Sequence, residues 1–240
     1  MTMISGPRSS VLGPVLSPRS SVLGHRRTGL ALQTRQSPKT VDWGLETRTL
    51  RLIIGITGAT GTIYGVRLLE RLRESGVETH LVISRWGSRT LLHETPYTRE
   101  QVEALATVSY APGDMGAAIS SGSFRTDGMI VAPCSAKSLA AIAHGFGDNL
   151  IHRAADVVLK EQRKLVLAIR EAPLSAIHLE NMLTLARMGA LVMPPLPAFY
   201  NHPRTIDDIV DYTVARMLDQ FGFEVSGSAR WVGEMGVGTD

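Results

Sequence analysis

From Leu50 onward the chain alternates short aliphatic runs with longer stretches of helical periodicity. The predicted strands are Leu52–Ile56, Thr79–Ile83, Gly128–Ala132, Leu165–Ile169 and Ala190–Met193. The predicted helices are Thr62–Glu74, Ala136–Ala143, Ala155–Glu161, Ile177–Arg187 and Ile206–Phe221. Strands that alternate with helices pair in parallel, because each helix carries the chain back across the sheet. We therefore expect an α/β fold, with a doubly wound parallel sheet in a single flavodoxin- or Rossmann-like domain.

Residues 1–48 lack this alternation and are rich in Ser, Pro, Gly and Arg. The heptapeptide PRSSVLG occurs twice, at Pro7–Gly13 and Pro18–Gly24. One Val and one Leu in seven residues cannot form a buried face, and solenoid repeats are about 20–50 residues long. We predict a disordered low-complexity tail over residues 1–48 and a folded domain over residues 49–240. An organellar transit peptide has a similar Arg- and Ser-rich composition, and a vector leader or a misassigned start codon also stays open.

The basic charge of the chain comes from this tail. The whole chain has 25 Lys and Arg against 22 Asp and Glu, but residues 1–48 contain seven of the cations and two of the anions. The remaining residues therefore hold 18 cations against 20 anions. A slightly acidic body does not favour a nucleic-acid-binding surface, and we expect no nucleic-acid partner.

Three further classes of structure are disfavoured by the sequence. Charged residues interrupt every hydrophobic stretch within about ten positions, short of the ~20 apolar residues that cross a bilayer, so we predict no membrane span. A single cysteine, Cys134, excludes an internal disulfide and a Cys-rich metal site, and fits a reducing compartment. The seven histidines show neither H-x-H nor H-E-x-x-H spacing, and we predict no metal site.

The residues after the predicted strands are the candidates for binding, because ligands of open parallel sheets lie beyond the carboxyl ends of the strands. The segment 57–62, Thr-Gly-Ala-Thr-Gly-Thr, follows the first strand and opens a helix. Its backbone N–H groups could approach an anion there. The glycine spacing is not G-x-G-x-x-G, and a P-loop Lys is missing. This favours a mononucleotide phosphate or a bare anion, and a tight turn needed only for packing is the alternative.

Hydroxyl and charged side chains follow the next strands. Ser84 follows the second strand, and the segment 133–138, Pro-Cys-Ser-Ala-Lys-Ser, follows the third. These hydroxyls could bind a ligand or only cap a helix. Arg170 and Glu171 follow the fourth strand and could hold an anion and transfer a proton, unless they form a solvated pair. Cys134 could be a nucleophile at a helix N-terminus, but we favour a buried, inert thiol.

Eight segments together resemble the UbiX-type flavin prenyltransferases, formerly described as phenylacrylic or hydroxyarylic acid decarboxylase subunits. They are GATG at 58–61, ISSGSF at 119–124, PCS at 133–135, RAADV at 153–157, LKE at 159–161, REAPL at 170–174, HLENM at 178–182 and PAFY at 197–200. The resemblance covers roughly Arg51 to Trp231. Many ordered motifs in one chain are far more specific than any one of them.

The resemblance implies a flavoprotein domain that binds reduced FMN and dimethylallyl monophosphate, needs no metal and forms a homo-oligomer, usually a dodecamer. It would join the dimethylallyl group to flavin N5, close a ring onto C6 and supply prenylated FMN to a UbiD-type decarboxylase. We expect a cytoplasmic location, or a mitochondrial one if residues 1–48 are a transit peptide. A flavodoxin-like FMN carrier and an FMN-dependent aromatic acid decarboxylase are the rival functions.

The resemblance also implies roles for individual residues. The FMN contacts would come from Gly58, Ala59, Thr60, Ser84, Ser135, Ala136, Lys137, Ser138 and Arg170. The prenyl phosphate would meet Arg153, Lys160, Tyr200 and Arg216. Glu171 matches the family's acid/base carboxylate, and Thr60 stands where many members have Ser and keeps the catalytic hydroxyl. Trp231 could face the allyl group, with a core or interface tryptophan as the alternative. Cations and a phenol would replace Mg²⁺ in stabilising the leaving phosphate.

Overall fold

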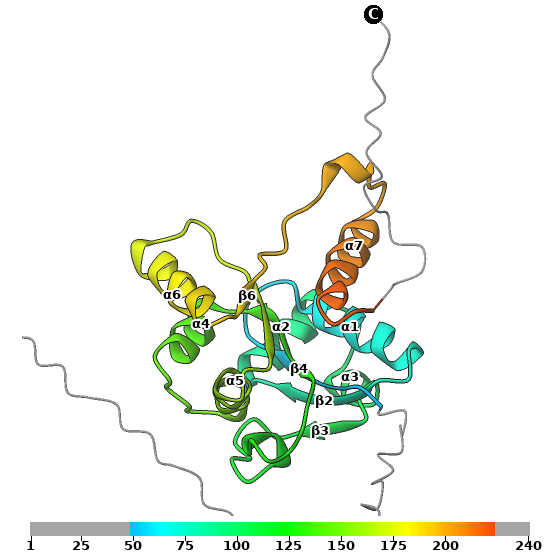
Figure 1. Cartoon of the computed structure of the whole chain (residues 1–240). Helices are drawn as coiled ribbons and strands as arrows, with labels where there is room; N and C mark the ends of the chain where they lie inside the picture. Colours follow the sequence, from blue (N-terminus) through cyan, green and yellow to red (C-terminus); the bar gives the residue numbers. More distant parts are fainter. Residues whose placement is uncertain (1–48, 224–240) are drawn as a thin grey trace, which may run out of the picture. The chain divides into compact units, whose positions relative to one another are not determined.

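The computed structural model describes residues 49–223 (Figure 1). This part contains a six-stranded sheet in which every pairing is parallel, with the order β3-β2-β1-β4-β5-β6. The strands are β1 (Arg51–Ile56), β2 (Glu78–Ile83), β3 (Val108–Tyr110), β4 (Gly128–Cys134), β5 (Lys164–Ile169) and β6 (Leu191–Val192). The predicted doubly wound α/β fold is confirmed. The tail predicted for residues 1–48 lies outside the described residues and stays a prediction.

Helices connect the strands. The α-helices of residues 49–223 are α1 (Thr62–Glu74), α2 (Arg85–Glu94), α3 (Arg99–Glu103), α4 (Ala136–Ala143), α5 (Leu150–Lys160), α6 (Ala176–Arg187) and α7 (Ile206–Asp219). Two 3-10 helices are η1 (Ala118–Ser120) and η2 (Phe199–Asn201). Among these helices, none is both long and apolar enough to cross a bilayer.

Three elements, α2, α3 and β3, are absent from the sequence prediction. Helix α2 buries only Gly87 and Leu91 and is polar on average, so its sequence carries few apolar residues to reveal a helix. It begins because the Ser84 hydroxyl accepts a hydrogen bond from the Gly87 backbone N–H at 2.9 Å, as an N-cap does. Strand β3 has three residues at the edge of the sheet and is partly exposed, so it lacks the buried pattern that identifies the other strands.

Other boundaries also differ from the prediction. The helix expected from Ala155 begins at Leu150, because the Asn149 side chain caps it by accepting from the His152 backbone N–H at 3.1 Å. Strand β4 continues two residues beyond Ala132, through Cys134. The strand expected over residues 190–193 is shorter and covers residues 191–192.

The two faces of the sheet carry separate apolar layers. Alternate residues of the strands point to opposite faces, as the pleat requires. In β1, Leu52, Ile54 and Ile56 pack with α1, α2, α3 and α7 on one face, whereas Ile53 packs with α4, α5 and α6 on the other. Figure 1 shows α1 and α7 on one side of the sheet, and α4, α5 and α6 on the other.

The strand order creates a crevice between β1 and β4. The chain runs outward from β1 through β2 to β3, then returns to β4 on the other side of β1. Connections diverge at such a switch point and leave a crevice beyond the carboxyl ends of the strands. Thr57 joins the two strand ends, because its backbone N–H and its hydroxyl donate to the Pro133 carbonyl oxygen at 3.2 and 2.7 Å. The residues following β1 and β4 are thereby held together.

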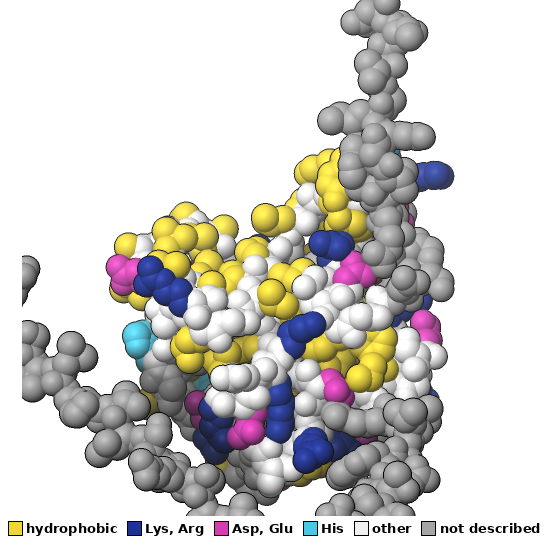
Figure 2. Space-filling view, viewed as in Figure 1, with side chains coloured by type: hydrophobic (Ala, Val, Ile, Leu, Met, Phe, Trp, Pro, Cys, Tyr) yellow, Lys and Arg dark blue, Asp and Glu magenta, His cyan; other side chains and the backbone are white. Residues whose placement is uncertain are grey.

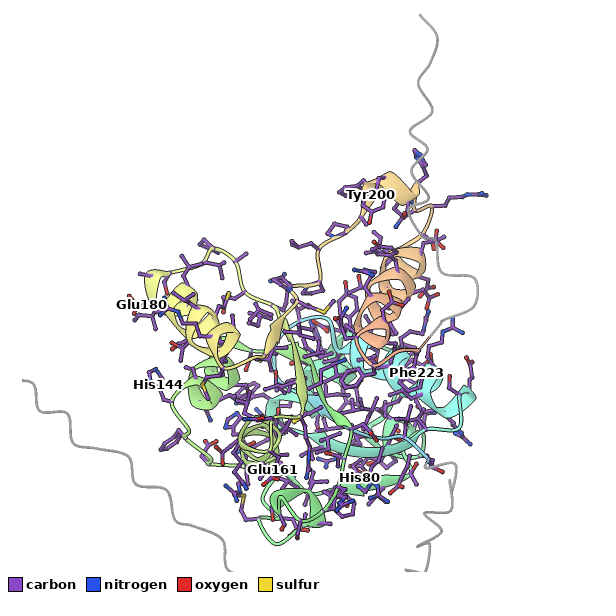
Figure 3. All side chains as sticks on the ribbon, in the orientation of Figure 1. His80, His144, Glu161, Glu180, Tyr200 and Phe223 are labelled. Atoms are coloured by element: carbon purple, nitrogen blue, oxygen red, sulfur yellow. The ribbon has the colours of Figure 1, made fainter. Side chains whose placement is uncertain are left out.

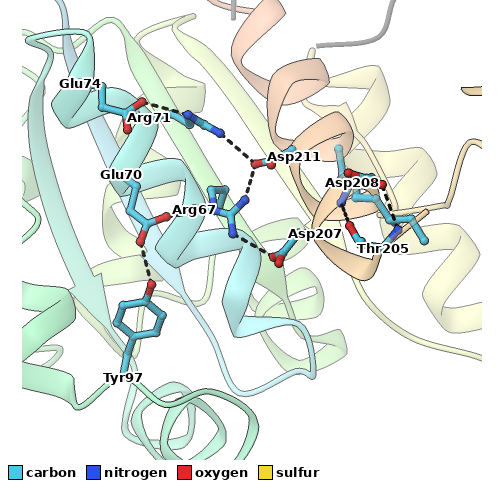
Figure 4. Close-up of polar contacts among 11 residues, drawn as sticks. Arg67, Glu70, Arg71, Glu74, Tyr97, Thr205, Asp207, Asp208 and Asp211 are labelled. Carbon is cyan, nitrogen blue, oxygen red and sulfur yellow. Dashed lines mark hydrogen bonds and ion pairs between the residues drawn. The ribbon is translucent and has the colours of Figure 1, made fainter. Parts of the chain in front are cut away.

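Helix α7 is attached to α1 by an ion-pair network (Figure 4). The Arg67 guanidinium contacts Asp211 and lies 3.0 Å from Asp207, while Arg71 lies 3.4 Å from Asp211. Glu70 accepts a hydrogen bond from the Tyr97 hydroxyl at 2.9 Å. A network of several charges contributes more than isolated surface pairs do, and this one fixes α7 against the body of the protein.

The close approach of α1 to the sheet gives a first prediction. A Cβ atom at Gly65 would lie 2.6 Å from the Ala132 carbonyl oxygen and 2.7 Å from the Ile56 side chain. Overpacking of this kind costs about 1–3 kcal/mol. A Gly→Ala change in a helix gains at most ~1 kcal/mol in return. We expect Gly65→Ala to lower the urea midpoint of unfolding. Gly116→Ala is the control, because its Cβ would meet no atom closer than 3.6 Å, and equal midpoints for both variants would contradict the packing argument.

Candidate functional site

A cleft of about 610 Å³ lies at the carboxyl edge of the sheet. Its lining comes from the segments after β1, β2, β3 and β4, and from the start of α5 with the two residues before it. The lining residues are Thr57, Gly58, Ser84, Arg85, Trp86, Pro112, Gly113, Ser135, Lys137, Ser138, Asp148, Asn149 and His152. This volume lies in the range of ligand pockets. Five of the predicted FMN residues, namely Gly58, Ser84, Ser135, Lys137 and Ser138, are thus brought together.

Three helices begin at the wall of this cleft. The N-cap residues Ser84 of α2, Ser135 of α4 and Asn149 of α5 all line it. Helix N-termini carry partial positive charge and attract anions. The exposed ammonium of Lys137 adds a full positive charge, although it also pairs with Asp148 at 3.1 Å. The cleft is therefore suited to a phosphate group.

The N-terminus of α1, by contrast, already holds an anion from the protein itself. The Glu94 carboxylate accepts hydrogen bonds from the backbone N–H groups of Gly61 and Thr62, at 2.8 and 3.2 Å. Burial opposes ionisation of Glu94, but hydrogen bonds from Thr60, Gly61 and Thr62 outweigh it and lower the pKa of this carboxyl. A side chain of α2 thus lies at the loop where the sequence predicts a bound anion. Thr60 contacts Glu94 and does not line the cleft.

A flat aromatic side chain forms one wall. Trp86 lines the cleft and is 64% exposed, which is unusual for tryptophan. A Cβ atom on Gly58 would lie 2.5 Å from the Trp86 Cβ, so glycine is needed for the first loop to pass beneath this residue. An exposed ring of this size is suited to stacking against an aromatic ligand.

The charged pair after β5 lies at the same edge of the sheet as the cleft. Strands β5 and β4 are parallel neighbours. Arg170 and Glu171, which follow β5, therefore lie at the same edge of the sheet as Ser135, which follows β4. The Arg170 backbone N–H donates to the Cys134 carbonyl oxygen at 3.0 Å, and both charged side chains are exposed. Neither Arg170 nor Glu171 lines the cleft in this single copy, nor do Ala59 and Ala136.

The four residues predicted to bind the prenyl phosphate lie in different parts of the structure. The Tyr200 hydroxyl, in η2, hydrogen-bonds the Tyr212 hydroxyl of α7, and Arg216 lies one helical turn beyond Tyr212. Arg153 lies on α5, where its guanidinium donates to the Ser120 carbonyl oxygen at 3.1 Å and pairs with Asp156 at 2.7 Å.

Lys160 ends α5 and pairs with Glu161 at 2.7 Å. The chain enters β5 four residues later, so Lys160 lies at the amino edge of the sheet, opposite the cleft. Figure 3 shows Glu161 and Tyr200 at opposite ends of the molecule. One copy of the chain therefore brings Tyr200 and Arg216 together but keeps Lys160 away from them.

Two other expectations concern residues outside the cleft lining. Cys134 is fully buried, as expected, and this burial raises the pKa of its thiol to about 12, which disfavours a nucleophilic thiolate. Trp231 lies outside the described residues. Within residues 49–223, the His, Cys, Asp and Glu side chains do not gather into a group of three that could hold a metal ion.

Several residues at the site were missed by sequence reasoning. Trp86 lies in the first turn and Glu94 at the last residue of the unpredicted helix α2, and Asn149 caps the unpredicted start of α5. His152 was left without a role because no histidine spacing points to a site, yet it lines the cleft and is 2% exposed. The one usable signal was the Asp148-Asn149 pair, since Asn is a strong helix N-cap.

The comparisons with known proteins agree with this cleft. The family model described as Flavoprotein matches residues 44–218. A probable UbiX-like flavin prenyltransferase of Bacillus subtilis is 60% identical over 77% of this chain and 90% of its own length. The mitochondrial flavin prenyltransferase PAD1 of Saccharomyces cerevisiae is 49% identical over 93% of this chain and 89% of its own.

Two crystal structures are also similar. AnUbiX (PadA1), in complex with FMN and dimethylallyl pyrophosphate, has a TM-score of 0.77 at 52% identity and covers 78% of this chain and 100% of its own. A dodecameric FMN-dependent Ubix-like decarboxylase from Escherichia coli O157:H7 has a TM-score of 0.76 at 62% identity and covers 77% and 100%.

The doubly wound sheet, with an anion-attracting cleft at its switch point, places this chain among the flavoproteins, whose family model spans most of it. Sequence identities of 49–62% with flavin prenyltransferases, over three quarters or more of the chain, narrow the class of flavoprotein further. The chain belongs to the UbiX-type flavin prenyltransferase family, and the resemblance found in its sequence is confirmed.

Proposed function

We propose that this protein transfers a dimethylallyl group from dimethylallyl monophosphate to N5 and C6 of reduced FMN, and that a UbiD-type decarboxylase uses the prenylated flavin. The observation that carries this proposal is the cleft, where two helix N-termini capped by serine meet Lys137 beside an exposed tryptophan. The named activity of relatives at about 60% identity supports it. The AnUbiX complex contains the diphosphate, so the monophosphate is part of the proposal.

The residues of the cleft fit FMN. The N-terminus of α2 would hold the phosphate, because its first-turn N–H groups lie beside Ser84. Trp86 and the glycine at position 58 would accommodate the ring system, since a side chain at 58 would collide with Trp86. Reduced flavin would supply the nucleophilic nitrogen and carbon of the reaction. The residues of the protein would transfer protons and stabilise the departing phosphate.

Three roles then fall to residues of this chain. Glu171 would take up and return protons at the flavin, because it is the charged acid after β5, at the same edge as the cleft. Thr60 would place its hydroxyl by its hydrogen bond with the Glu94 carboxylate. Arg153, Lys160, Arg216 and Tyr200 would stabilise the departing phosphate, as fixed positive charges and hydrogen-bond donors do in a site without water.

The last of these roles requires more than one copy of the chain. Lys160 lies at the amino edge of the sheet, and Tyr200 lies at the opposite end of the molecule. We infer that a neighbouring subunit supplies Lys160 in a homododecamer, the assembly described for the Escherichia coli O157:H7 relative.

Exposed apolar side chains offer a surface for this assembly. Figure 2 shows hydrophobic groups over α6 and over the segment before α7. They include Ile177, Leu179, Leu183 and Met188 near α6, and Leu196, Phe199 and Ile206 before or at the start of α7, all at least 50% exposed. Exposed apolar side chains gathered in this way mark an interaction site.

The location of the protein is a separate proposal. We propose the cytoplasm for the domain itself, with mitochondria as the alternative. The match to the mitochondrial yeast relative is too long to fit within residues 49–240, so it extends into the Arg- and Ser-rich tail. A fluorescent reporter fused to residues 1–48 distinguishes the two locations.

The purified protein tests the function directly. We expect incubation with reduced FMN and dimethylallyl monophosphate, without added metal, to yield a flavin whose mass has grown by one dimethylallyl unit. Parallel reactions with dimethylallyl pyrophosphate and without a donor show which phosphate is used. Unchanged flavin together with CO₂ release from an aromatic acid would instead indicate a decarboxylase. Unchanged flavin that only exchanges electrons would indicate a carrier.

A further inference from the structure

We propose that Asp148 and His152 are a positioning pair that fixes the direction of the Ser138 and Ser135 hydroxyls, so that the cleft offers hydrogen-bond acceptors to N–H or O–H groups of its ligand. The proposal rests on the proposed function only in taking the ligand to be a flavin. It concerns a group of side chains on α4, on α5 and in the segment joining them.

The histidine has a defined tautomer. The Nδ1 atom of His152 lies 2.6 Å from Asp148 Oδ1, and Nε2 lies 3.0 Å from Ser138 Oγ. An ionised carboxylate can only accept, so the Nδ1 atom carries the hydrogen. Burial lowers the pKa of His152 and outweighs the opposing effect of Asp148, so the ring is neutral at physiological pH. Nε2 is then an acceptor, and the Ser138 hydroxyl must donate to it.

Because the Ser138 hydroxyl donates to His152, the direction of its hydrogen bond with Ser135 is also fixed. The Ser135 hydroxyl donates to Ser138 Oγ at 3.2 Å and accepts from the Ser138 backbone N–H at 3.3 Å. Both hydroxyl protons are thus used inside the protein, and each oxygen turns its remaining lone pair outward. Both serines line the cleft. A ligand group that meets them must donate, as a flavin ring N–H or a ribityl hydroxyl can, whereas a phosphate oxygen cannot.

The surroundings of the ring explain why the arrangement holds and what would reverse it. Asp148 and Lys137 are the charged groups whose fields act on His152, with opposite signs. Asp148 is held by the Asn149 side-chain amide at 2.9 Å and by Lys137 at 3.1 Å. Protonation of His152 would make Nε2 a donor. The Ser138 proton would then turn away, and the ligand would face a donor instead of an acceptor.

The test is the FMN dissociation constant of the full-length protein and its variants, measured by flavin fluorescence between pH 5 and 8. We expect Asp148→Asn to weaken binding about 3- to 10-fold at pH 8, because an amide donating to Nδ1 moves the ring hydrogen to Nε2, and one neutral hydrogen bond is worth about that factor. We expect His152→Gln to stay within about 2-fold of the unmodified protein at pH 8, because the Gln side chain still accepts from Ser138.

The pH profile separates positioning from mere packing. The control variant is His144→Gln, which changes an exposed histidine just after α4. The affinity of this control and of the unmodified protein for FMN should fall as the pH falls through the pKa of His152. His152→Gln should not show the loss of FMN affinity that protonation of His152 causes. Its pH profile should contain only the effect of the titrating FMN phosphate, which all variants share. Identical profiles for His152→Gln and His144→Gln, or unaltered affinity in Asp148→Asn, would overturn the proposal. Because the readout is binding, a protein with the expected profile but no prenylated product would refute only the proposed function.

Discussion

Replacing Glu171 by Gln is expected to slow prenyl transfer by about 10²- to 10⁴-fold while FMN remains bound, which is the usual cost of losing a positioned general acid or base. Gln keeps nearly the volume of Glu and some of its hydrogen bonding, but it cannot titrate. Glu171 directly follows β5, where one carboxylate oxygen accepts from the Ala172 backbone N–H at 3.1 Å. That contact orients the carboxylate without pairing it to a cation.

The measurement is single-turnover absorbance after reduced enzyme–FMN is mixed with dimethylallyl monophosphate. Samples quenched along the time course distinguish the open N5 adduct from the closed ring and show which proton transfer is slowed. Glu180→Gln is the matched control, because it removes an exposed carboxylate from α6 (Figure 3). A Glu171→Gln variant with the rate of the unmodified protein would reduce this residue to a structural role.

Lys160→Ala is expected to weaken dimethylallyl monophosphate binding by about 10- to 150-fold and to spare FMN, since a charge-assisted hydrogen bond is worth about 1.5–3 kcal/mol. Separate titrations of donor and flavin measure the two affinities. Lys164→Ala removes a second exposed lysine from the same edge of the sheet and should change neither. Loss of both affinities in Lys160→Ala would mean that the lysine supports the fold instead of the donor.

Mixed oligomers test whether the site is shared between subunits. Co-expression of Lys160→Ala chains with Glu171→Gln chains should restore part of the activity that each variant alone lacks. The reason is the position of Lys160 at the amino edge, far from Glu171 at the carboxyl edge. Some cleft regions would then receive an intact lysine from one chain and an intact glutamate from another. No recovery in the mixture would place both residues in the same subunit's site.

The sequence predicted the sheet well because its central strands are buried on both faces and read as continuous aliphatic runs. Strands β1 and β5 begin within one residue of their expected positions. Helix α2 was not predicted because it is mostly polar. Its residues Trp86 and Glu94 were therefore not recognised as part of the site. Periodicity reports what a helix buries, so it cannot identify a helix whose main contribution is its N-terminus.

Motif matching assigned residues to the site but could not show how they are distributed. Ser84, Ser135 and Ser138 meet in one cleft because they follow β2 and β4, the two parallel strands on either side of β1. Lys160 and Tyr200 cannot meet within a single chain, since one ends a helix at the amino edge and the other lies in a segment beyond the carboxyl edge. Spacing along the sequence carries no information on a contact made between copies. The pairing of His152 with Asp148 joins residues four positions apart, but only burial distinguishes it from an ordinary surface pair.

The carboxylate of Glu94 at the start of α1 also bears on which nucleotides this fold is suited to bind. In sheets with this strand order, the helix after the first strand is where dinucleotides place their pyrophosphate. Here the Gly61 and Thr62 N–H groups are already satisfied by a negative charge. NAD or FAD approaching in that pose would meet electrostatic repulsion in place of hydrogen-bond donors. We therefore expect this one side chain to disfavour dinucleotides, whereas the neighbouring helix N-termini stay accessible to a mononucleotide.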